Sequence, residues 1–284
     1  MAEFLHVLRT EPFMQRAVLV GLLASLACAV IGTYVVVKRV TYISGGISHA
    51  LLGGIGVAYF LGANPLLGAL AAGLVSAAIF GLVCLHAGQH EDTTIGALWA
   101  VGMAVGIVFM YMTPGYQQDL MSYLFGNILL VTRTDASLLA YLDVAILIIV
   151  VLFYKQFQAL CFDEEFTLIQ GVRVDVFYLL LLGLTALTVV ILVQVVGIIL
   201  VIALLTLPAA TAGHYAGSLR QMMLLALVVG IACTLGGLAV SYPYNLPPGA
   251  TIVLISGGIY LLSTLFCGLV LRGMRAARRT PSGR

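Results

Sequence analysis

Residues 177–216 read FYLLLLGLTALTVVILVQVVGIILVIALLTLPAATAGHYA and contain no Asp, Glu, Lys or Arg. A helix of about 20 apolar residues is long enough to cross the hydrocarbon core of a bilayer, and this run is about twice that length. Gly197 near its middle predicts two short helices that meet at a tight turn. Pro208 would bend the second helix, either as a hinge or as a fixed kink. The stretch therefore indicates membrane-spanning helices.

Similar apolar runs recur along the whole chain, in which 62% of the 284 residues are hydrophobic and only 8% are charged. Soluble domains carry about 25% charged residues, so lipid must be the solvent for this chain. The runs are continuous and do not alternate at period two, which argues against a β-barrel. We expect an all-α, polytopic membrane protein with about eight or nine transmembrane helices in a single domain, residues 1–284. The spans are expected near 14–37, 42–62, 65–86, 94–113, 135–155, 177–197, 198–216, 220–242 and 250–271.

The distribution of basic residues predicts the orientation, because cytoplasmic loops carry an excess of Lys and Arg. If the turn at 38–41 is cytoplasmic, only Arg9, Arg16 and Arg133 of the 13 Lys and Arg residues lie outside. This orientation places the N-terminus outside and the C-terminus in the cytoplasm. Residues 272–284 then form a basic cytoplasmic tail that contacts anionic lipid headgroups.

Two polar segments interrupt the apolar pattern. Residues 114–134 are too polar at their start to span, and we expect an outer re-entrant or surface segment. Residues 156–176 form a long cytoplasmic connection that mixes acidic and aromatic side chains. A connection of this length usually has a function or a partner. We interpret it as a coupling segment.

Signatures of several enzyme classes are missing from the sequence. A nucleotide-hydrolysing pump needs a lysine in GxxxxGK[ST], and neither Lys38 nor Lys155 lies in such a motif. HExxH and GxSxG are also absent, so we expect no enzymatic activity in this chain. Transport would then be driven by an ion gradient or by a separate ATPase. A gradient-driven carrier commonly has several acidic groups at mid-membrane, and only Asp143 is a clear case here.

Several stretches resemble one known family, the permease subunits of the zinc and manganese class of bacterial ABC importers. They are ISHALLGGIGVAYFLG (47–62), EDTTIGALWAVGMAVGI (91–107), DLMSYLFGNILLVT (119–132), VQVVGIILVIALLTLPAATA (193–212) and YNLPPGATIVLISG (244–257). The resemblance implies a homodimeric permease in the bacterial plasma membrane. It also implies a cytoplasmic ATPase that binds ATP and an outer metal-binding protein. No covalently bound cofactor and no nucleic-acid partner are expected.

The candidate metal pathway centres on His49, which lies about seven residues, or ~10 Å, into the second span. Neutral imidazole is a good ligand for zinc and manganese, and Ser48 precedes it. A histidine at this depth is costly unless it is paired or faces a wet cavity, and a hydrogen bond to a neighbouring helix is the alternative. Nearby glycines would permit an unwound start of the helix and close helix contacts. These are Gly45, Gly46, Gly53 and Gly54.

The sequence departs from the family at Gly45, where many members carry an aspartate four residues before this histidine. Asp143 and Asp119 are the candidate replacement carboxylates. A helix–helix hydrogen bond is the alternative for Asp143, and plain solvent exposure for Asp119. The missing aspartate favours zinc, because borderline ions prefer imidazole whereas manganese accepts more oxygen ligands.

By the same resemblance, residues 162–172 (FDEEFTLIQGV) form the coupling helix that docks on the ATPase. A short amphipathic helix would bury Phe162 and Phe166, at i and i+4, in a groove of the ATPase. The acidic residues would meet basic groups at its rim, and a surface helix lying on the membrane is the alternative. The remaining residues assigned to coupling are Asp163, Glu164, Glu165 and Gly171.

The sequence as a whole favours the membrane subunit of an ATP-driven importer of a divalent metal, with zinc ahead of manganese and iron. An ion-coupled secondary transporter is the first alternative and predicts more charge within the membrane. An ABC importer of a metal chelate is the second and predicts a wider pathway without a histidine ligand.

Overall fold

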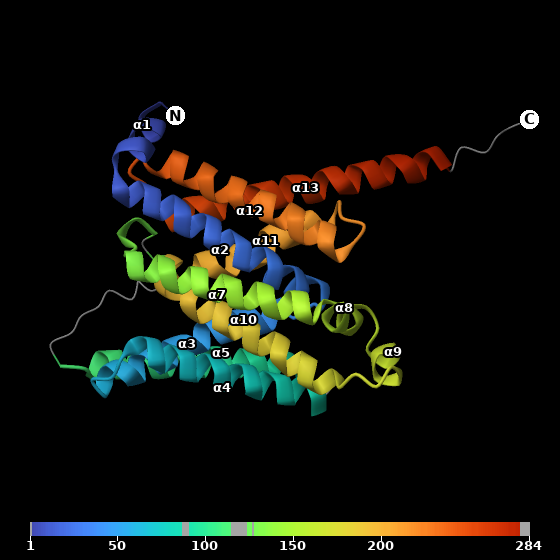
Figure 1. The fold of residues 1–284 in the computed structure, drawn as a ribbon, viewed down its shortest axis with the longest axis horizontal. Helices are drawn as coiled ribbons and strands as arrows, with labels where there is room; N and C mark the ends of the chain where they lie inside the picture. The colour runs from blue at the N-terminus through green and yellow to red at the C-terminus, as the bar shows by residue number, and fades with distance from the viewer. Residues whose placement is uncertain (1, 87–90, 115–123, 127, 279–284) are drawn as a thin grey trace, which may run out of the picture.

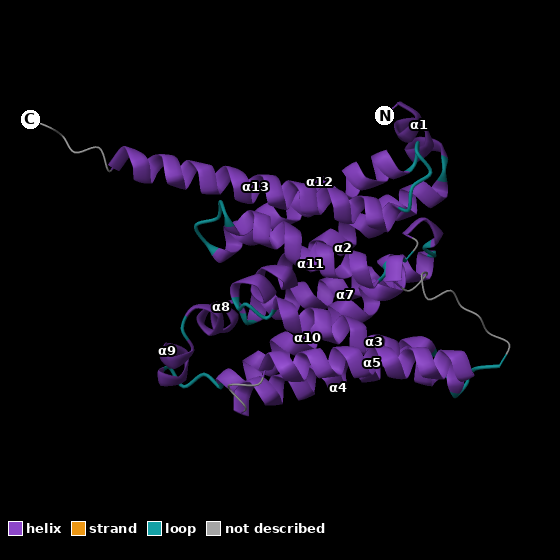
Figure 2. Cartoon of the chain, turned by 180° about the vertical axis from the view of Figure 1, so that it is seen from behind, coloured by secondary structure: helices purple, strands orange, loops and turns teal. Residues whose placement is uncertain are grey.

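The computed structural model describes residues 2–86, 91–114, 124–126 and 128–278, and these form helices joined by turns and loops, with no strand among them (Figures 1 and 2). Eight helices are long and apolar enough to span a membrane, which confirms the expected all-α membrane protein. They are α2 (Pro12–Val37), α3 (Thr41–Phe60), α4 (Pro65–His86), α5 (Glu91–Met112), α7 (Arg133–Leu152), α10 (Val174–Val196), α12 (Leu219–Ser241) and α13 (Pro248–Arg278). The shorter helices are α1 (Ala2–Thr10), η1 (Ile128–Leu130), α8 (Tyr154–Phe162), α9 (Glu164–Ile169) and α11 (Ile198–Gly213).

The long apolar run forms α10 and α11, which meet at Gly197 as expected. Gly197 has a φ of 82°, in the left-handed region that favours glycine. A Cβ atom there would lie 2.9 Å from the Cα of Gly126. The backbone at Gly126, shortly before η1, therefore packs directly against the backbone of this turn. Helix α11 has only 16 residues and continues through the buried Pro208. The described residues therefore contain eight spans, and the candidate ninth is this shorter helix.

The bundle has two groups of helices joined at its centre (Figure 1). Helices α3, α4 and α5 pack together on one side, and α11, α12 and α13 pack together on the other. Helix α10 packs against α4, while α2 packs against α11, α12 and α7. The central helices α2 and α10 thus connect the two groups and contribute much of the buried apolar core.

Glycines let α3 approach α5 with its backbone. A Cβ atom at Gly53 would lie 2.9 Å from the carbonyl oxygen of Gly102, and one at Gly102 would lie 2.7 Å from the Cα of Ala50. A Cβ atom at Gly54 would lie 2.5 Å from the Cβ of Ala72 on α4. Small residues at such positions allow close van der Waals packing in the membrane. These contacts fix the position of α3 relative to both neighbours.

The two ends of the bundle differ. Helices α8 and α9 lie at the end where α2 finishes and α3 begins, which we call the α9 end (Figure 1). At the opposite end η1 packs against α2 and α13, and Ile128 is buried. Of the segment 114–134, residues 115–123 and 127 lie outside the described residues. Helix α13 continues through Arg278, so the first part of the basic segment 272–284 is helical.

Candidate functional site

His49 of α3 stacks on Trp99 of α5. The ring centroids are 4.2 Å apart and the ring planes are inclined by 12°. Tyr42, two turns earlier on α3, lies 6.0 Å from the same indole. The Nδ1 atom of His49 is buried and has no hydrogen-bond partner within the described part of the chain. The ring is therefore held by stacking. Its Nδ1 atom neither accepts nor donates a hydrogen bond within the described residues.

The residues around His49 differ in what they offer a cation. A Cβ atom at Gly45 would lie 3.7 Å from Trp99, an ordinary contact distance, so this position lies beside the indole. Ser48 is buried, and its hydroxyl donates a hydrogen bond to the carbonyl oxygen of Ser44 at 2.8 Å. Helix α3 runs without interruption through Gly45 and Gly46, so the permitted unwound start is not seen. A Cβ atom at Gly46 would meet Phe80 at 3.0 Å, which places Gly46 at a packed contact with α4.

Asp143 lies apart from His49. It belongs to α7, which packs against α2 and α10, whereas α3 packs mainly against α4 and α5. The side chain is 3% exposed, and neither carboxyl oxygen has a hydrogen-bond partner in the described residues, so the alternative helix–helix bond is not seen. The Cys28 thiol of α2 lies near this carboxyl group. Asp119 lies outside the described residues.

The structure does not assemble a preformed metal centre from the residues it describes. Among them, no three His, Cys, Asp or Glu side chains are close enough to share one ion. His49 and Asp143 are thus two separate polar positions in the membrane-spanning region. This arrangement suits a conduit that holds a cation transiently better than a storage site.

The coupling segment differs from the single helix predicted. Asp163 ends α8 with an extended backbone, φ −155° and ψ 99°, and α9 begins at Glu164. Phe162 and Phe166 therefore belong to different helices, and the i, i+4 arrangement on one helix is wrong. The side chain of Phe166 lies outside the described residues. The exposed apolar side chains of the segment are Phe162, 64% exposed, Leu168, 59%, and Ile169, 82%.

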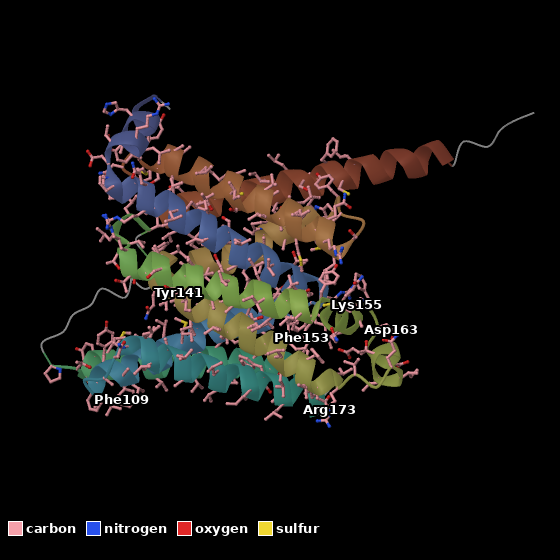
Figure 3. The ribbon with its side chains drawn as sticks, viewed as in Figure 1. Phe109, Tyr141, Phe153, Lys155, Asp163 and Arg173 are labelled. Carbon is pink, nitrogen blue, oxygen red and sulfur yellow. The ribbon has the colours of Figure 1, made fainter. Side chains whose placement is uncertain are left out.

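Helix α9 has a local structure that the sequence partly indicates. The Thr167 hydroxyl donates a hydrogen bond to the carbonyl oxygen of Asp163 at 2.5 Å. This bond links the middle of the short helix α9 to the residue just before its first turn. Gly171 follows α9 with a φ of 77°, so the chain can turn sharply back toward α10. Figure 3 shows Lys155, Asp163 and Arg173 at the same end of the bundle. Apolar and charged groups are thus presented together at the α9 end.

An ion pair connects α9 to the turn between α2 and α3. Lys38, the residue after α2, pairs with Glu164, the first residue of α9. The Lys38 ammonium also lies 5.6 Å above the ring of Tyr178 on α10. A cavity of about 340 Å³ adjoins this pair and is lined by residues of α3, α4, α5 and α10. A movement of α9 would therefore displace the turn before α3, the helix that carries His49.

Sequence reasoning missed Trp99 as the partner of His49 and Lys38 as the partner of Glu164. Both residues are rare in the sequence, since Trp99 is the only tryptophan of the chain and Lys38 is one of two lysines. Their rarity could have drawn attention to them, but it does not show which residues they contact, because that depends on how the helices pack.

The model of the family "ABC 3 transport family" matches residues 10–267 of the chain. An uncharacterized membrane protein of Synechocystis sp. is 47% identical over 254 residues, covering 89% of this chain and 90% of that protein. The manganese transport system membrane protein MntC of Halalkalibacterium halodurans is 33% identical and covers 97% of this chain and 95% of its own length. Among solved structures, PsaBC from Streptococcus pneumoniae in complex with Fab aligns with a TM-score of 0.83 at 33% identity, covering 92% of this chain and 94% of the matched chain.

Proposed function

The chain belongs to the ABC 3 transport family, and from that membership we propose that it is the membrane permease that carries a divalent metal ion in an ATP-driven importer. The observation that carries this proposal is the buried Nδ1 of His49, which has no hydrogen-bond partner in the described residues. A neutral imidazole nitrogen is a ligand for first-row divalent metals. Placed inside a membrane span, this nitrogen would replace one water ligand of a cation that reaches it partway across.

Manganese is the first candidate for the transported ion. A relative that covers nearly the whole chain is named for manganese transport, and no relative reported above is named for zinc. Manganese prefers more oxygen ligands than one imidazole supplies, so main-chain oxygens, water or a carboxylate would complete its coordination. Asp143 and Asp119 remain candidates for that carboxylate, with Asp143 reached only after movement of α7 relative to α3.

The coupling role is proposed for the α9 end. Phe162, Leu168 and Ile169 present apolar surface beyond the end of the spans, where a separate cytoplasmic ATPase would bury it. The acidic groups of Asp163, Glu164 and Glu165 would meet basic groups around that contact, as proposed from the sequence. Glu164 is already paired with Lys38, so docking would act on the α2–α3 turn directly. In this arrangement the N-terminus lies outside, as the basic residues predict, where a metal-binding protein delivers its ion to a permease homodimer.

The two alternatives are less well supported by the site. A secondary transporter would need several acidic groups in its spans, and Asp143 is the one acidic side chain that the described spans bury. A chelate importer would need a wide pathway, whereas His49 is stacked on Trp99 at 4.2 Å and flanked by tightly packed glycines.

Reconstitution tests the proposal. Proteoliposomes would hold this chain with its ATPase and a metal-loaded binding protein, and uptake would be measured with manganese and with zinc. The proposal expects uptake of manganese that requires ATP and both partners, with a vanadate-inhibited sample as the control. Uptake by the chain alone under a proton gradient would replace the proposal with a secondary transporter. ATP-dependent uptake of zinc only would retain the importer and reject manganese as its ion.

A further inference from the structure

A groove on the outer surface of the bundle runs along α2, between α7 and α12. Helix α2 lies between these two helices (Figure 1) and packs against both of them. Its residues Leu26, Ala29 and Val30 form the floor of the groove. The groove has a volume of about 430 Å³. Ala29 and Val30 on the floor are 2% and 7% exposed, so the groove is bounded by well-packed structure.

The walls and the mouth of the groove have different chemistry. Val151 of α7 and Leu224 of α12 form opposite rims and are 72% and 65% exposed, so both lie on the outer surface of the bundle. At the α9 end the mouth is formed by Tyr154 and Arg220, whose guanidinium lies 4.8 Å above the tyrosine ring. Arg220 is the one charged residue that lines the groove, and it makes no ion pair within the described part of the chain.

We propose that this groove is a binding site for an anionic phospholipid, with an acyl chain between α7 and α12 and the phosphate at Arg220. The groove extends from Arg220 to Leu227, which is about 10 Å along a helix and matches the upper part of an acyl chain. Its mouth lies where α7 ends and α12 begins, which is the depth of lipid headgroups. Arginine binds phosphate through a planar fork of donors, and stacking on Tyr154 holds that fork in place.

The proposed lipid site lies at the start of α8, so a bound lipid would also affect α9. Tyr154 is the first residue of α8, and α8 leads directly into α9. A phosphate that holds Arg220 over Tyr154 would also hold the start of α8 against the bundle. An anionic lipid would therefore stabilise the connection between the spans and α9. This inference does not depend on which ion the chain carries.

Native mass spectrometry of the purified chain with added phosphatidylglycerol or phosphatidylcholine tests the site. We expect the wild type to retain phosphatidylglycerol about fivefold better, the ratio that corresponds to one basic side chain acting on an anionic headgroup. Arg220→Gln should remove this preference. Arg173→Gln is the matched control, because Arg173 is exposed at the same end of the bundle but directly precedes α10 and lies outside the groove.

A second variant tests the apolar part of the site. Leu224→Trp places a bulky ring on an exposed rim, so the fold tolerates it while the groove is obstructed. It should lower the retention of both lipids, whereas Leu254→Trp, at a 76% exposed position of α13, should not. Equal loss of selectivity in Arg220→Gln and Arg173→Gln would overturn the site. So would a wild type without lipid preference, or a Leu224→Trp variant that loses a dimer but keeps its lipid, because a second copy would then cover the groove.

Discussion

Replacing Gly102 by alanine tests whether direct backbone contact holds α3 against α5. The new Cβ atom would lie 2.7 Å from the Cα and 3.2 Å from the Cβ of Ala50, whereas ordinary contacts of this kind begin at 3.4 Å. Neither atom of Ala50 can rotate away, so the two helices must separate by roughly 1 Å. Overpacking of this kind costs about 1–3 kcal/mol.

Gly96 provides the matched control, because it lies on the same helix and a Cβ atom there would meet nothing within 4 Å. Alanine stabilises a helix interior by about 0.5–1 kcal/mol relative to glycine, and this gain applies to both variants. It cancels in their difference. Gly102→Ala should therefore be less stable than Gly96→Ala by about 1–3 kcal/mol, or about 5- to 150-fold in the folding equilibrium constant.

The assay is unfolding by SDS titration, followed by the fluorescence of Trp99 and by circular dichroism. Trp99 is the only tryptophan and stacks across the α3–α5 contact on His49, so its emission reports separation of these helices. Equal transition midpoints for the two variants would refute the reasoning. A Gly102→Ala variant more stable than Gly96→Ala would show that α3 and α5 are not in backbone contact.

Three further predictions concern the α9 end and the start of α7. Glu164→Gln should speed amide hydrogen exchange of residues 164–169 by up to about fivefold. The ion pair with Lys38 is partly exposed, so it stabilises α9 by about 0–1 kcal/mol. Glu165→Gln is the control and should leave the exchange rate unchanged. Burial raises the pKa of the Cys161 thiol to about 12, and only the thiolate reacts with an alkylating agent. Alkylation of Cys161 near pH 8, followed by mass spectrometry, should therefore be about 10³-fold slower in the folded protein than in SDS. Equal rates would contradict this prediction. Thr132→Ala removes the capping box of α7 and should lower the stability by about 1 kcal/mol in the same SDS titration; an unchanged midpoint would mean that this cap does not matter.

The sequence was sufficient to predict the helices because lipid imposes a simple rule. A spanning helix must be predominantly apolar over about 20 residues, so the spans appear in the sequence as long apolar stretches. The turn at Gly197 was also predictable, since a glycine in the middle of an otherwise suitable run marks a break. The resemblance of the motifs to zinc and manganese permeases is confirmed at the level of the family.

The coupling segment was predicted less well. Phe162 and Phe166 have the spacing of one helical face, but Asp163 takes an extended backbone and divides the segment into α8 and α9. Asp163 favours such a break because its short polar side chain competes with the helical backbone. Spacing alone does not reveal this, since the aspartate would also be acceptable within a surface helix.

The surroundings of the candidate site required the packing of distant segments. His49 was predicted from its cost inside a span, but Trp99 becomes its neighbour only because Gly53 and Gly102 set the register of α3 against α5. Asp143 is separated from His49 because α7 packs against α2 and α10, whereas α3 packs mainly against α4 and α5. Helix partners are decided by such close contacts, which a single sequence does not show.

Metal uptake by the His49→Ala permease tests the central claim most directly, in proteoliposomes that also hold the ATPase and the metal-loaded binding protein. His214→Ala is the control, because His214 is hydrogen-bonded to Ser263 at 3.0 Å and directly follows α11, which packs mainly against α2, α12 and α13. With both variants folded, as judged by circular dichroism, we predict that uptake falls at least about tenfold in His49→Ala, the effect of losing ~1.4 kcal/mol of coordination, and persists in His214→Ala. Wild-type uptake by His49→Ala would contradict the account and would leave His49 as a packing residue stacked on Trp99.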